Sequence, residues 1–227
     1  MKTAIIQSNY IPWLGYFNII SSVDKFVFYD TAQYTKRSWR NRNYIKTPNG
    51  KFMLTVPVKN KSNQFEKIEN IEIADKNWGK KHKKILDYNY KQSKYYKEIS
   101  NLIYDVYFDE DISYLSQVNS LLIKKISKYL NFETQFYFSS EFYMEKGPTE
   151  SLLSICKELE TNTYVTGPFG KTYLDENLFA KNNIELKFFE YPEYSHYNQL
   201  WGEDFISNLS IVDCLFNNGK NTTKYLM

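Results

Sequence analysis

Short apolar runs alternate with an amphipathic stretch at the start of the chain. Residues 3–7 and 25–30 are brief and apolar, with isoleucine, valine and phenylalanine prominent, which is typical of buried strands. Residues 12–23 between them carry apolar side chains at helical spacing, and Ser8 or Asn9 would cap that helix. The pattern predicts a strand, a helix and a second strand parallel to the first.

A turn signal follows, and beyond it the spacing of apolar residues becomes helical. The dipeptide Asn49-Gly50 separates two strand-like stretches, which predicts a β-hairpin with these two residues in its turn. Over residues 77–130 apolar side chains recur at roughly helical intervals, and Asp111 is the expected cap of the last helix. This part of the chain is therefore expected to form two or three helices.

The last third returns to alternation of strands and helices. Five segments are expected to be, in turn, strand, helix, strand, helix and strand: 134–140, 148–160, 163–167, 174–183 and 184–191. A final helix ends at Gly219. The whole pattern predicts an α/β fold, an open and mostly parallel sheet with a β-hairpin insertion and a helical middle segment. Since no linker or repeat interrupts it, we expect a single domain over residues 1–227, with the helical subregion at about 77–130.

Composition and charge narrow the range of partners. The chain has 29 Lys and Arg against 26 Asp and Glu, a formal net charge of +3, which argues against a binder of naked nucleic acid. No stretch approaches the ~18–20 apolar residues of a membrane helix, and no signal-peptide pattern is present. Two cysteines are too few for a disulfide framework, and no Cys/His spacing suggests zinc. We expect a cytoplasmic protein with no membrane span, no nucleic-acid partner and no metal.

Polar side chains gather where the first strand meets its helix. Gln7, Asn9 and Tyr10 occupy this crossing. In open α/β sheets the carboxyl ends of strands face the ligand crevice, and helix N-termini favour anions, so the crossing is a candidate rim of a binding site. The alternative is that these residues only cap the helix and fill the sheet edge. The pattern of a dinucleotide-binding or phosphate-binding loop is absent.

A basic, amide-rich segment precedes the first hairpin strand. Alternation would place Arg40 and Arg42 on one face and Asn41 and Asn43 on the other. Paired guanidinium groups suit a phosphate, a pyrophosphate or a carboxylate, and the indole of Trp39 can stack on a base or a sugar. The alternative is a solvated edge strand whose charges prevent aggregation.

The chain has two histidines and two notable carboxylates that could act in proton transfer. His82 lies in a predicted helix among four lysines and apolar neighbours, where burial would lower its proton affinity and suit a base. A hydrogen bond from His82 to a carbonyl in a partly buried position is the alternative. His196 lies in a loop crowded with tyrosines. Asp30 follows the second strand, where it could also cap a turn, and Asp213 lies in an apolar run, where a carboxyl group needs a partner or stays protonated.

Other candidate groups are weaker. Cys156 and Cys214 have the surroundings of core residues, and no nucleophile elbow is present, which disfavours a covalent acyl-enzyme. Residues 167–171 follow a predicted strand and contain two glycines, so that a ligand could approach the backbone at Gly167 while Lys171 meets an anion. A tight turn without a binding role is the alternative.

Together these pieces resemble the WbqC-like family, bacterial proteins often encoded with enzymes that build O-antigens and other glycoconjugates. The likeness covers nearly the whole chain and rests on Gln7 with Asn9-Tyr10-Ile11-Pro12-Trp13, Asp30 with Gln33-Tyr34, Ser38-Trp39-Arg40-Asn41-Arg42-Asn43, Trp78 with Lys81-His82, Gly167-Pro168, Tyr197 with Gln199, and Leu209-Ser210-Ile211-Val212-Asp213. Family members commonly have Gly-Pro-Ser-Gly where this chain has Gly167-Pro168-Phe169-Gly170.

The resemblance implies a cytoplasmic enzyme of O-antigen or lipopolysaccharide biosynthesis. We expect an acyl- or aminoacyl-transferase that modifies the amine of a nucleotide-linked deoxyamino sugar, with a thioester donor on coenzyme A or a carrier protein and no permanently bound cofactor. One alternative is a non-catalytic scaffold that binds a sugar nucleotide or an acyl-carrier partner. Another is a hydrolase of thioesters or glycans.

Each candidate residue has an expected role in such a transfer. Arg40 and Arg42 would hold the pyrophosphate, His82 or His196 would take the proton from the amine, and Asp30 or Asp213 would orient that base. The candidate substrate-binding residues are Gln7, Asn9, Tyr10, Gln33, Tyr34, Trp39, Arg40, Asn41, Arg42, Asn43, Gly167 and Lys171.

Overall fold

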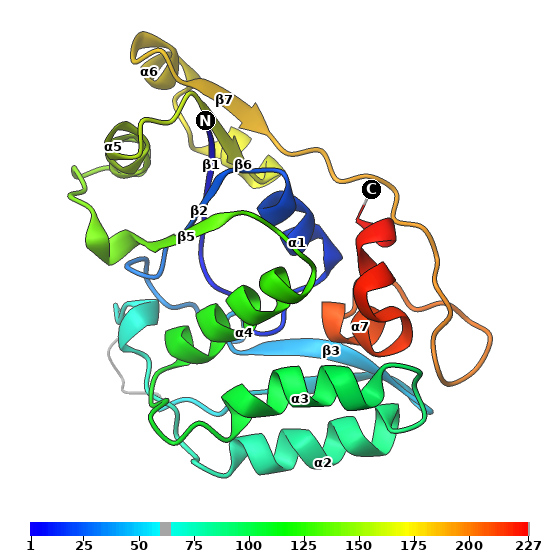
Figure 1. Ribbon diagram of the computed structural model, residues 1–227. Coiled ribbons are helices and arrows are strands. Elements are labelled where there is room, and N and C mark those ends of the chain that lie inside the picture. Colours follow the sequence, from blue (N-terminus) through cyan, green and yellow to red (C-terminus); the bar gives the residue numbers. More distant parts are fainter. Residues whose placement is uncertain (60–64, 227) are drawn as a thin grey trace.

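A five-stranded parallel sheet forms the centre of the upper half of the molecule in Figure 1. The computed structural model describes residues 1–59 and 65–226. The strand order is β5-β2-β1-β6-β7, and every neighbouring pair is parallel. The strands are β1 (Lys2–Ile6), β2 (Lys25–Phe28), β5 (Gln135–Phe138), β6 (Thr163–Thr166) and β7 (Glu185–Phe188).

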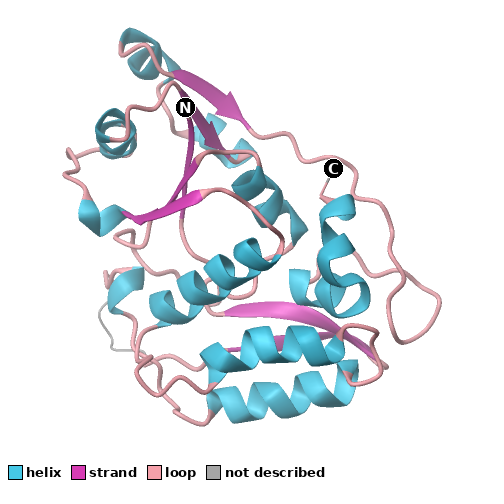
Figure 2. Cartoon of the chain, viewed as in Figure 1, coloured by secondary structure: helices cyan, strands magenta, loops and turns pink. Residues whose placement is uncertain are grey.

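Helices cover both faces of this sheet (Figure 2). The helices α1 (Leu14–Ser21) and α4 (Leu115–Tyr129) belong to a hydrophobic cluster that includes Ala4 and Phe26. The helices α5 (Glu150–Glu158) and α6 (Glu176–Lys181) belong to a second cluster, which includes Ile5 and Val27. Because successive strand residues face opposite sides, these alternating residues show that the two clusters lie on opposite faces.

The direction of the chain through the sheet reverses between β1 and β6. From β1 it proceeds to β2 and then β5, and afterwards it crosses to the other side of β1 to form β6 and β7. Two neighbouring strands whose connections leave in opposite directions define a switch point, and ligands of open α/β sheets bind outside the carboxyl ends of those strands. If the register of β1 and β6 is continued past the last pair, Ala4 and Val165, Gly167 comes opposite Ile6, one residue before Gln7.

The lower half in Figure 1 contains a separate hairpin and the helical segment. The hairpin pairs β3 (Arg42–Thr47) with β4 (Gly50–Thr55). Near it lie α2 (Trp78–Tyr90) and α3 (Tyr96–Tyr107), and α7 (Ile211–Asn218) contacts both β3 and α3. The described residues also form short 3₁₀ helices: η1 (Ile68–Asn70), η2 (Ser139–Glu141), η3 (Pro168–Thr172) and η4 (Gly219–Tyr225). In the part of the chain that is described, no helix is long and apolar enough to cross a membrane.

The α/β class, the parallel sheet, the hairpin and the helices of the middle segment confirm the predictions from the sequence. Gly219 ends α7 with a φ of +55°, a conformation that glycine adopts without strain. The hairpin turn differs in detail, because Thr47 pairs with Gly50 and leaves Pro48 and Asn49 as its central residues. Gly50 itself begins β4 with a φ of +92°.

The predicted helix caps were wrong. Helix α4 begins at Leu115 rather than after Asp111, because the side chain of Gln117 accepts hydrogen bonds from the backbone of Ser113 and Tyr114. Helix α1 begins after Trp13, with no side-chain cap. Ser8 and Asn9 do not cap it, because their side chains are hydrogen-bonded to residues far along the chain.

Candidate functional site

Arg40 lies at the carboxyl end of β1. Its guanidinium donates to the side-chain oxygens of Gln7 and Asn9, two of the three polar residues that follow this strand. Burial lowers the pKa of Arg40, and the nearby Tyr16 and Asp30 counteract that effect, so the guanidinium stays charged. Within the described residues no carboxylate is hydrogen-bonded to it. In the Arg40 cluster, defined as Gln7, Asn9 and Arg40, the guanidinium is therefore hydrogen-bonded to neutral amides, with the carboxyl group of Asp30 nearby.

Helix α4 fixes the backbone of Arg40. The side chain of Asn119 donates to the carbonyl oxygen of Arg40 over 2.8 Å and to the Ser8 hydroxyl over 3.1 Å. On the other side, the backbone N–H of Tyr10 donates to the carbonyl of Trp39 over 3.0 Å. Because these contacts come from both β1 and α4, the position of the guanidinium depends on elements that are far apart in the sequence.

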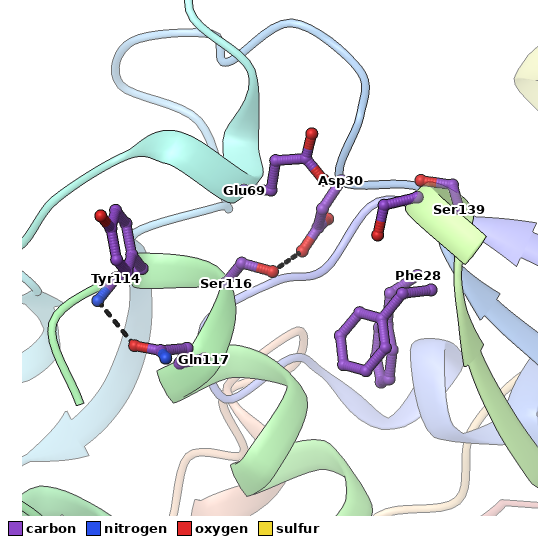
Figure 3. A pocket seen from close by; sticks show the side chains of 9 residues that line it. Phe28, Asp30, Glu69, Tyr114, Ser116, Gln117 and Ser139 are labelled. Atoms are coloured by element: carbon purple, nitrogen blue, oxygen red, sulfur yellow. Dashed lines mark hydrogen bonds between the residues drawn. The ribbon is translucent and has the colours of Figure 1, made fainter. Parts of the chain in front are cut away.

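Asp30 lies beside this cluster at the end of β2. Its carboxylate accepts hydrogen bonds from the Ser8 backbone over 2.8 Å and from the Ser116 hydroxyl. Burial raises the pKa of Asp30, and the hydrogen bonds from Ser116 and Ser8 counteract this in part. Figure 3 shows the carboxylate directed toward Ser116, with Glu69 and Ser139 lining the same small pocket of about 190 Å³. Asp30 is thus a buried carboxylate that borders both the pocket and the Arg40 cluster.

Arg42 has a different environment from Arg40. Its guanidinium donates to the backbone carbonyl of Arg37, and its buried Nε has no hydrogen-bond partner. The charge of Arg42 acts to lower the pKa of Tyr34, although burial raises that pKa more. The two arginines that were expected to form a pair thus have separate partners.

Asn41 and Asn43 are buried and hydrogen-bonded to backbone. The Asn43 amide donates to the carbonyls of Tyr10 and Ile11 over 3.3 and 2.9 Å, and its oxygen accepts from the backbone of Tyr44 over 2.8 Å. The Asn41 amide donates to the carbonyl of Val56 over 2.9 Å. These contacts hold the β1–α1 connection and the hairpin. The buried Oδ1 of Asn41 has no hydrogen-bond partner among the described residues.

His82 is enclosed in the interior. Its Nε2 lies 3.1 Å from the carbonyl oxygen of Thr55, which can only accept, so Nε2 carries the proton and Nδ1 accepts from the Tyr10 hydroxyl over 2.7 Å. Tyr10 also hydrogen-bonds Tyr107, and its side chain is fully buried. Burial lowers the pKa of His82 to about 4. Neither ring nitrogen is free to take a proton from a substrate, in agreement with the alternative role as a histidine bonded to a carbonyl.

Asp213 is a buried hub of hydrogen bonds in α7. Its carboxylate accepts from Tyr90, Tyr197 and Gln199 over 2.7, 2.8 and 2.9 Å. Burial raises its pKa, and these donors counteract the effect in part. Since Tyr90 belongs to α2 while Tyr197 and Gln199 belong to the long segment after β7, Asp213 connects this segment to the core.

His196 lines a cavity of about 350 Å³ near the start of α1. Its ring stacks on Phe205 with the centroids 4.1 Å apart. We define the aromatic pocket by the six rings that line this cavity: Trp13, Tyr191, Tyr194, His196, Tyr197 and Phe205. The tyrosines around His196 were visible in the sequence, whereas the participation of Trp13 and Phe205 depends on the path of the chain.

The remaining predicted residues lie around these features. Gly167 ends β6, and the Tyr191 hydroxyl lies 3.7 Å from the point that a Cβ at Gly167 would occupy. The Lys171 ammonium lies 5.3 Å from the centre of the Phe188 ring. Trp39 is 50% exposed and meets the ring of Tyr44 edge-on.

Gln33 and Tyr34 pair through their backbones with residues 66–67.

The groups available for chemistry are limited. The thiols of Cys156 and Cys214 are buried, and burial raises the pKa of each to about 12, so neither supplies a thiolate. Across residues 1–59 and 65–226, no three side chains of His, Cys, Asp or Glu converge on a point where a metal ion could bind.

Comparisons with known proteins give a family but no activity. The model of the WbqC-like protein family matches residues 7–225. A Mycobacterium tuberculosis (strain ATCC 25618 / H37Rv) protein, described as uncharacterized protein Rv1507c, is 41% identical over 225 residues, which are 99% of this chain and 97% of the relative. No solved structure matches the chain.

Proposed function

We propose, from the premise that the chain belongs to the WbqC-like protein family, that this protein is an acyl- or aminoacyl-transferase acting on the amine of a nucleotide-linked deoxyamino sugar. The observation that carries the proposal is the charge of Arg40. This guanidinium lies at the switch point of the sheet and bonds only neutral amides among the described residues. A positive charge at that edge favours an anionic ligand such as the pyrophosphate of a sugar nucleotide.

Gln7 and Asn9 set the orientation of the guanidinium. Each accepts from a different terminal nitrogen of Arg40, so the plane of the fork is fixed by two bonds from one loop. A planar donor that is held in this way matches two oxygens of a phosphate without a further loss of side-chain freedom. The nucleotide part of the substrate is thereby oriented before the reacting amine is positioned.

Direct transfer needs no covalent enzyme intermediate. The sugar amine attacks the carbonyl carbon of a thioester, a C–N bond forms, the C–S bond breaks, and the thiolate leaves. His196, exposed on the aromatic pocket, accepts the proton from the nitrogen and returns it to the departing sulfur. The buried, protonated thiols of Cys156 and Cys214 support this route over a covalent one.

One observation favours a second candidate, a binding protein without catalysis. Three of the four predicted catalytic side chains, Asp30, His82 and Asp213, are engaged in internal hydrogen bonds. A protein that presents a sugar nucleotide to a partner enzyme needs the anion contact of Arg40 but no free base. The two candidates differ in whether substrate is consumed.

The test is an assay of the purified protein with acyl- and aminoacyl-thioesters and a panel of nucleotide-linked amino sugars. We expect an amide product by mass spectrometry and one free thiol per product. The matched control is the sugar nucleotide that has a hydroxyl in place of the amine, which should give no product. Thermal stabilisation by the sugar nucleotide without turnover would identify the binding protein, and thiol release without an amine would identify a hydrolase.

A pair of variants tests whether His196 is the general base. His196→Gln is expected to lower turnover at saturating sugar nucleotide by about 10²–10⁴-fold. His82→Gln serves as the control, since the ring of His82 is enclosed, and should keep turnover within a few-fold as long as the variant is folded. Equal turnover of His196→Gln and the parent protein would remove His196 from the mechanism.

A further inference from the structure

We infer that the aromatic pocket binds the base of the nucleotide while the Arg40 cluster binds its phosphates. The inference rests on the nucleotide-linked substrate of the proposed function and assigns the base to a place different from Trp39 and Tyr34. Three observations support it: the aromatic rings that line the pocket, the polar groups between those rings, and the position of the pocket near the switch point.

Rings from separate segments converge in the pocket. Trp13 precedes α1, and its ring centre lies 5.1 Å from that of Tyr191 and 5.6 Å from that of Tyr194. His196 and Phe205 form a stacked pair at 4.1 Å. Bases stack on aromatic faces with little dependence on base identity. The cavity of about 350 Å³ lies at the small end of the range of ligand pockets, about 300–1,000 Å³, and so suits a base with part of its sugar rather than a whole sugar nucleotide.

Polar groups between the rings favour a base over an acyl chain. Glu193, Ser207 and Asn208 line the cavity together with the aromatic side chains. The Tyr194 hydroxyl accepts a hydrogen bond from Asn18 over 3.2 Å, which fixes its ring at the wall. An alkyl chain would cover such groups without bonding them, at a cost of desolvation, whereas the edge of a base presents both donors and acceptors.

The pocket lies next to the switch point. The hydroxyl of Tyr191 approaches Gly167, at the carboxyl end of β6, and Gly167 leaves the sheet near Gln7. Asn9, which bonds Arg40, and Trp13 are four residues apart, so their Cα atoms lie at most about 14 Å from one another. One ligand that bends at its diphosphate can therefore place its phosphates at Arg40 and its base in the pocket, while its sugar amine returns to His196 at the exposed edge of the pocket. In Figure 1 the segment after β7, which supplies most of the rings, runs down the right side of the molecule past α7.

The experiment compares nucleoside diphosphates with inorganic pyrophosphate by titration calorimetry, in the absence of any acyl donor. Uridine, thymidine, cytidine and guanosine diphosphates serve as the nucleotide probes. We expect at least one of them to bind about tenfold more tightly than pyrophosphate, because only the nucleotide fills the pocket. Equal affinity of pyrophosphate and of all four nucleotides would overturn the inference.

Variants of the pocket test where the nucleotide base binds. Tyr191→Leu and Phe205→Leu are expected to weaken the nucleotide about tenfold and to leave pyrophosphate unchanged, whereas Tyr191→Phe keeps the ring and the affinity. Tyr143→Leu is the matched control, because Tyr143 is 75% exposed and lies outside the pocket. Arg40→Lys should weaken both ligands by similar factors, because it alters the anion contact alone.

Two outcomes separate this inference from the proposed function. If a nucleotide binds and Trp39→Leu weakens it while Tyr191→Leu and Phe205→Leu do not, the base lies elsewhere and the transferase proposal stands. If the pocket variants lose nucleotide as expected but no thioester is consumed with any amino sugar, the base site stands and the transferase proposal fails. Thermal unfolding of each variant confirms that a lost affinity is not a lost fold.

Discussion

Arg40 and His82 show how burial acts differently on two basic side chains. A guanidinium keeps its proton in the interior because its intrinsic pKa is very high, so the charge of Arg40 remains available to a ligand. An imidazole instead loses its proton when it is buried, and His82 becomes a neutral group that donates to one partner and accepts from another. The same burial thus leaves Arg40 charged and His82 neutral.

The pH dependence of stability should report on His82. The pKa of His82 is about 4 in the folded protein and near 6.5 in an unfolded chain. As the pH falls through 6.5, the unfolded chain takes up a proton that the folded protein does not, so stability is full above pH 6.5 and decreases down to pH 4. The loss from this one group amounts to about 3 kcal/mol.

Urea unfolding of the parent protein and of His82→Gln at pH 7, 6 and 5 measures this contribution. The stability difference between the two proteins should change with pH, because all other titrating groups are common to both. His196→Gln removes an imidazole from an exposed position and is the matched control. Parallel curves for the parent and His82→Gln over this range would contradict the assignment.

The types of the polar residues in the sequence predicted where the candidate site lies better than they predicted the role of each residue. Gln7, Asn9 and Arg40 were all candidates, and the structure brings them together. Asn43 and Asp213 were candidates for the same reasons but bond groups inside the fold. An amide or a carboxyl group has the same donors and acceptors whether its partner is a ligand or a backbone group, and only the three-dimensional path of the chain decides between them.

The connection between β1 and α1 is the element on which the candidate site depends. Ile11 has a φ of +35°, which is strained for a β-branched residue, and it is fully buried. Asn43 donates to the carbonyls of Tyr10 and Ile11 and so holds this turn from the neighbouring hairpin. The turn leads from Asn9 in the Arg40 cluster to Trp13 in the aromatic pocket.

Asn43→Ala should therefore affect both stability and binding. It leaves buried carbonyls without a donor, at a cost of about 1–3 kcal/mol, and frees the strained turn. We expect lower stability in urea together with weaker binding of pyrophosphate, since Asn9 no longer holds Arg40 in place. Asn49→Ala, on the exposed turn of the same hairpin, is the control and should change neither. Unchanged pyrophosphate affinity in a folded Asn43→Ala protein would show that the turn does not support the site.

The spacing of apolar residues predicted the helices and strands correctly, but the residues expected to cap two helices placed the starts of those helices wrongly. Apolar spacing identified the strands of the sheet, the hairpin and the helices, because burial of one face requires that spacing. Asn9 and Ser8 do not cap helix α1, because their side chains are hydrogen-bonded to Arg40 and Asn119. These contacts join distant parts of the chain. Local capping rules describe a helix end in isolation and cannot foresee a competing partner from another element.

At the scale of the molecule, Asp213 joins parts that are far apart in the sequence. Through its three donors it connects α7 to α2 and to the segment after β7 that carries most of the aromatic pocket. The donors replace the water that the carboxylate loses on burial, so removing the charge leaves them with a poorer acceptor. The pocket therefore depends on Asp213, a buried residue that does not itself line it.

Asp213→Asn is expected to lower the free energy of unfolding by about 3 kcal/mol, because three hydrogen bonds to a charged group are weakened at once. Amide hydrogen exchange over residues 191–209 should become faster before exchange in β1 and β2 does. The control is Asp204→Asn, which changes an exposed side chain in the same segment. Uniform acceleration across the sheet would instead mean that Asp213 stabilises the whole fold and not this segment in particular.

The strand order could not be predicted from local pattern. The alternation of strands and helices implied a parallel sheet, but the position of β6 beside β1 depends on pairing between strands that are separated by residues 7–162 of the chain. That order creates the switch point, so the location of the candidate site is a property of topology. The sequence identified individual candidate side chains, but it did not predict that they come together at one edge of the sheet.

The proposed recognition of an anion through Arg40 has a consequence for divergence among related chains. Folds that bind phosphate with backbone amides of a glycine-rich loop retain that ability through most changes of side chain. Here the charge belongs to one residue, supported by Gln7 and Asn9. On this proposal, replacing that residue alone would remove the positive charge from the candidate anion site, so a related chain could lose its preference for an anion in a single mutational step.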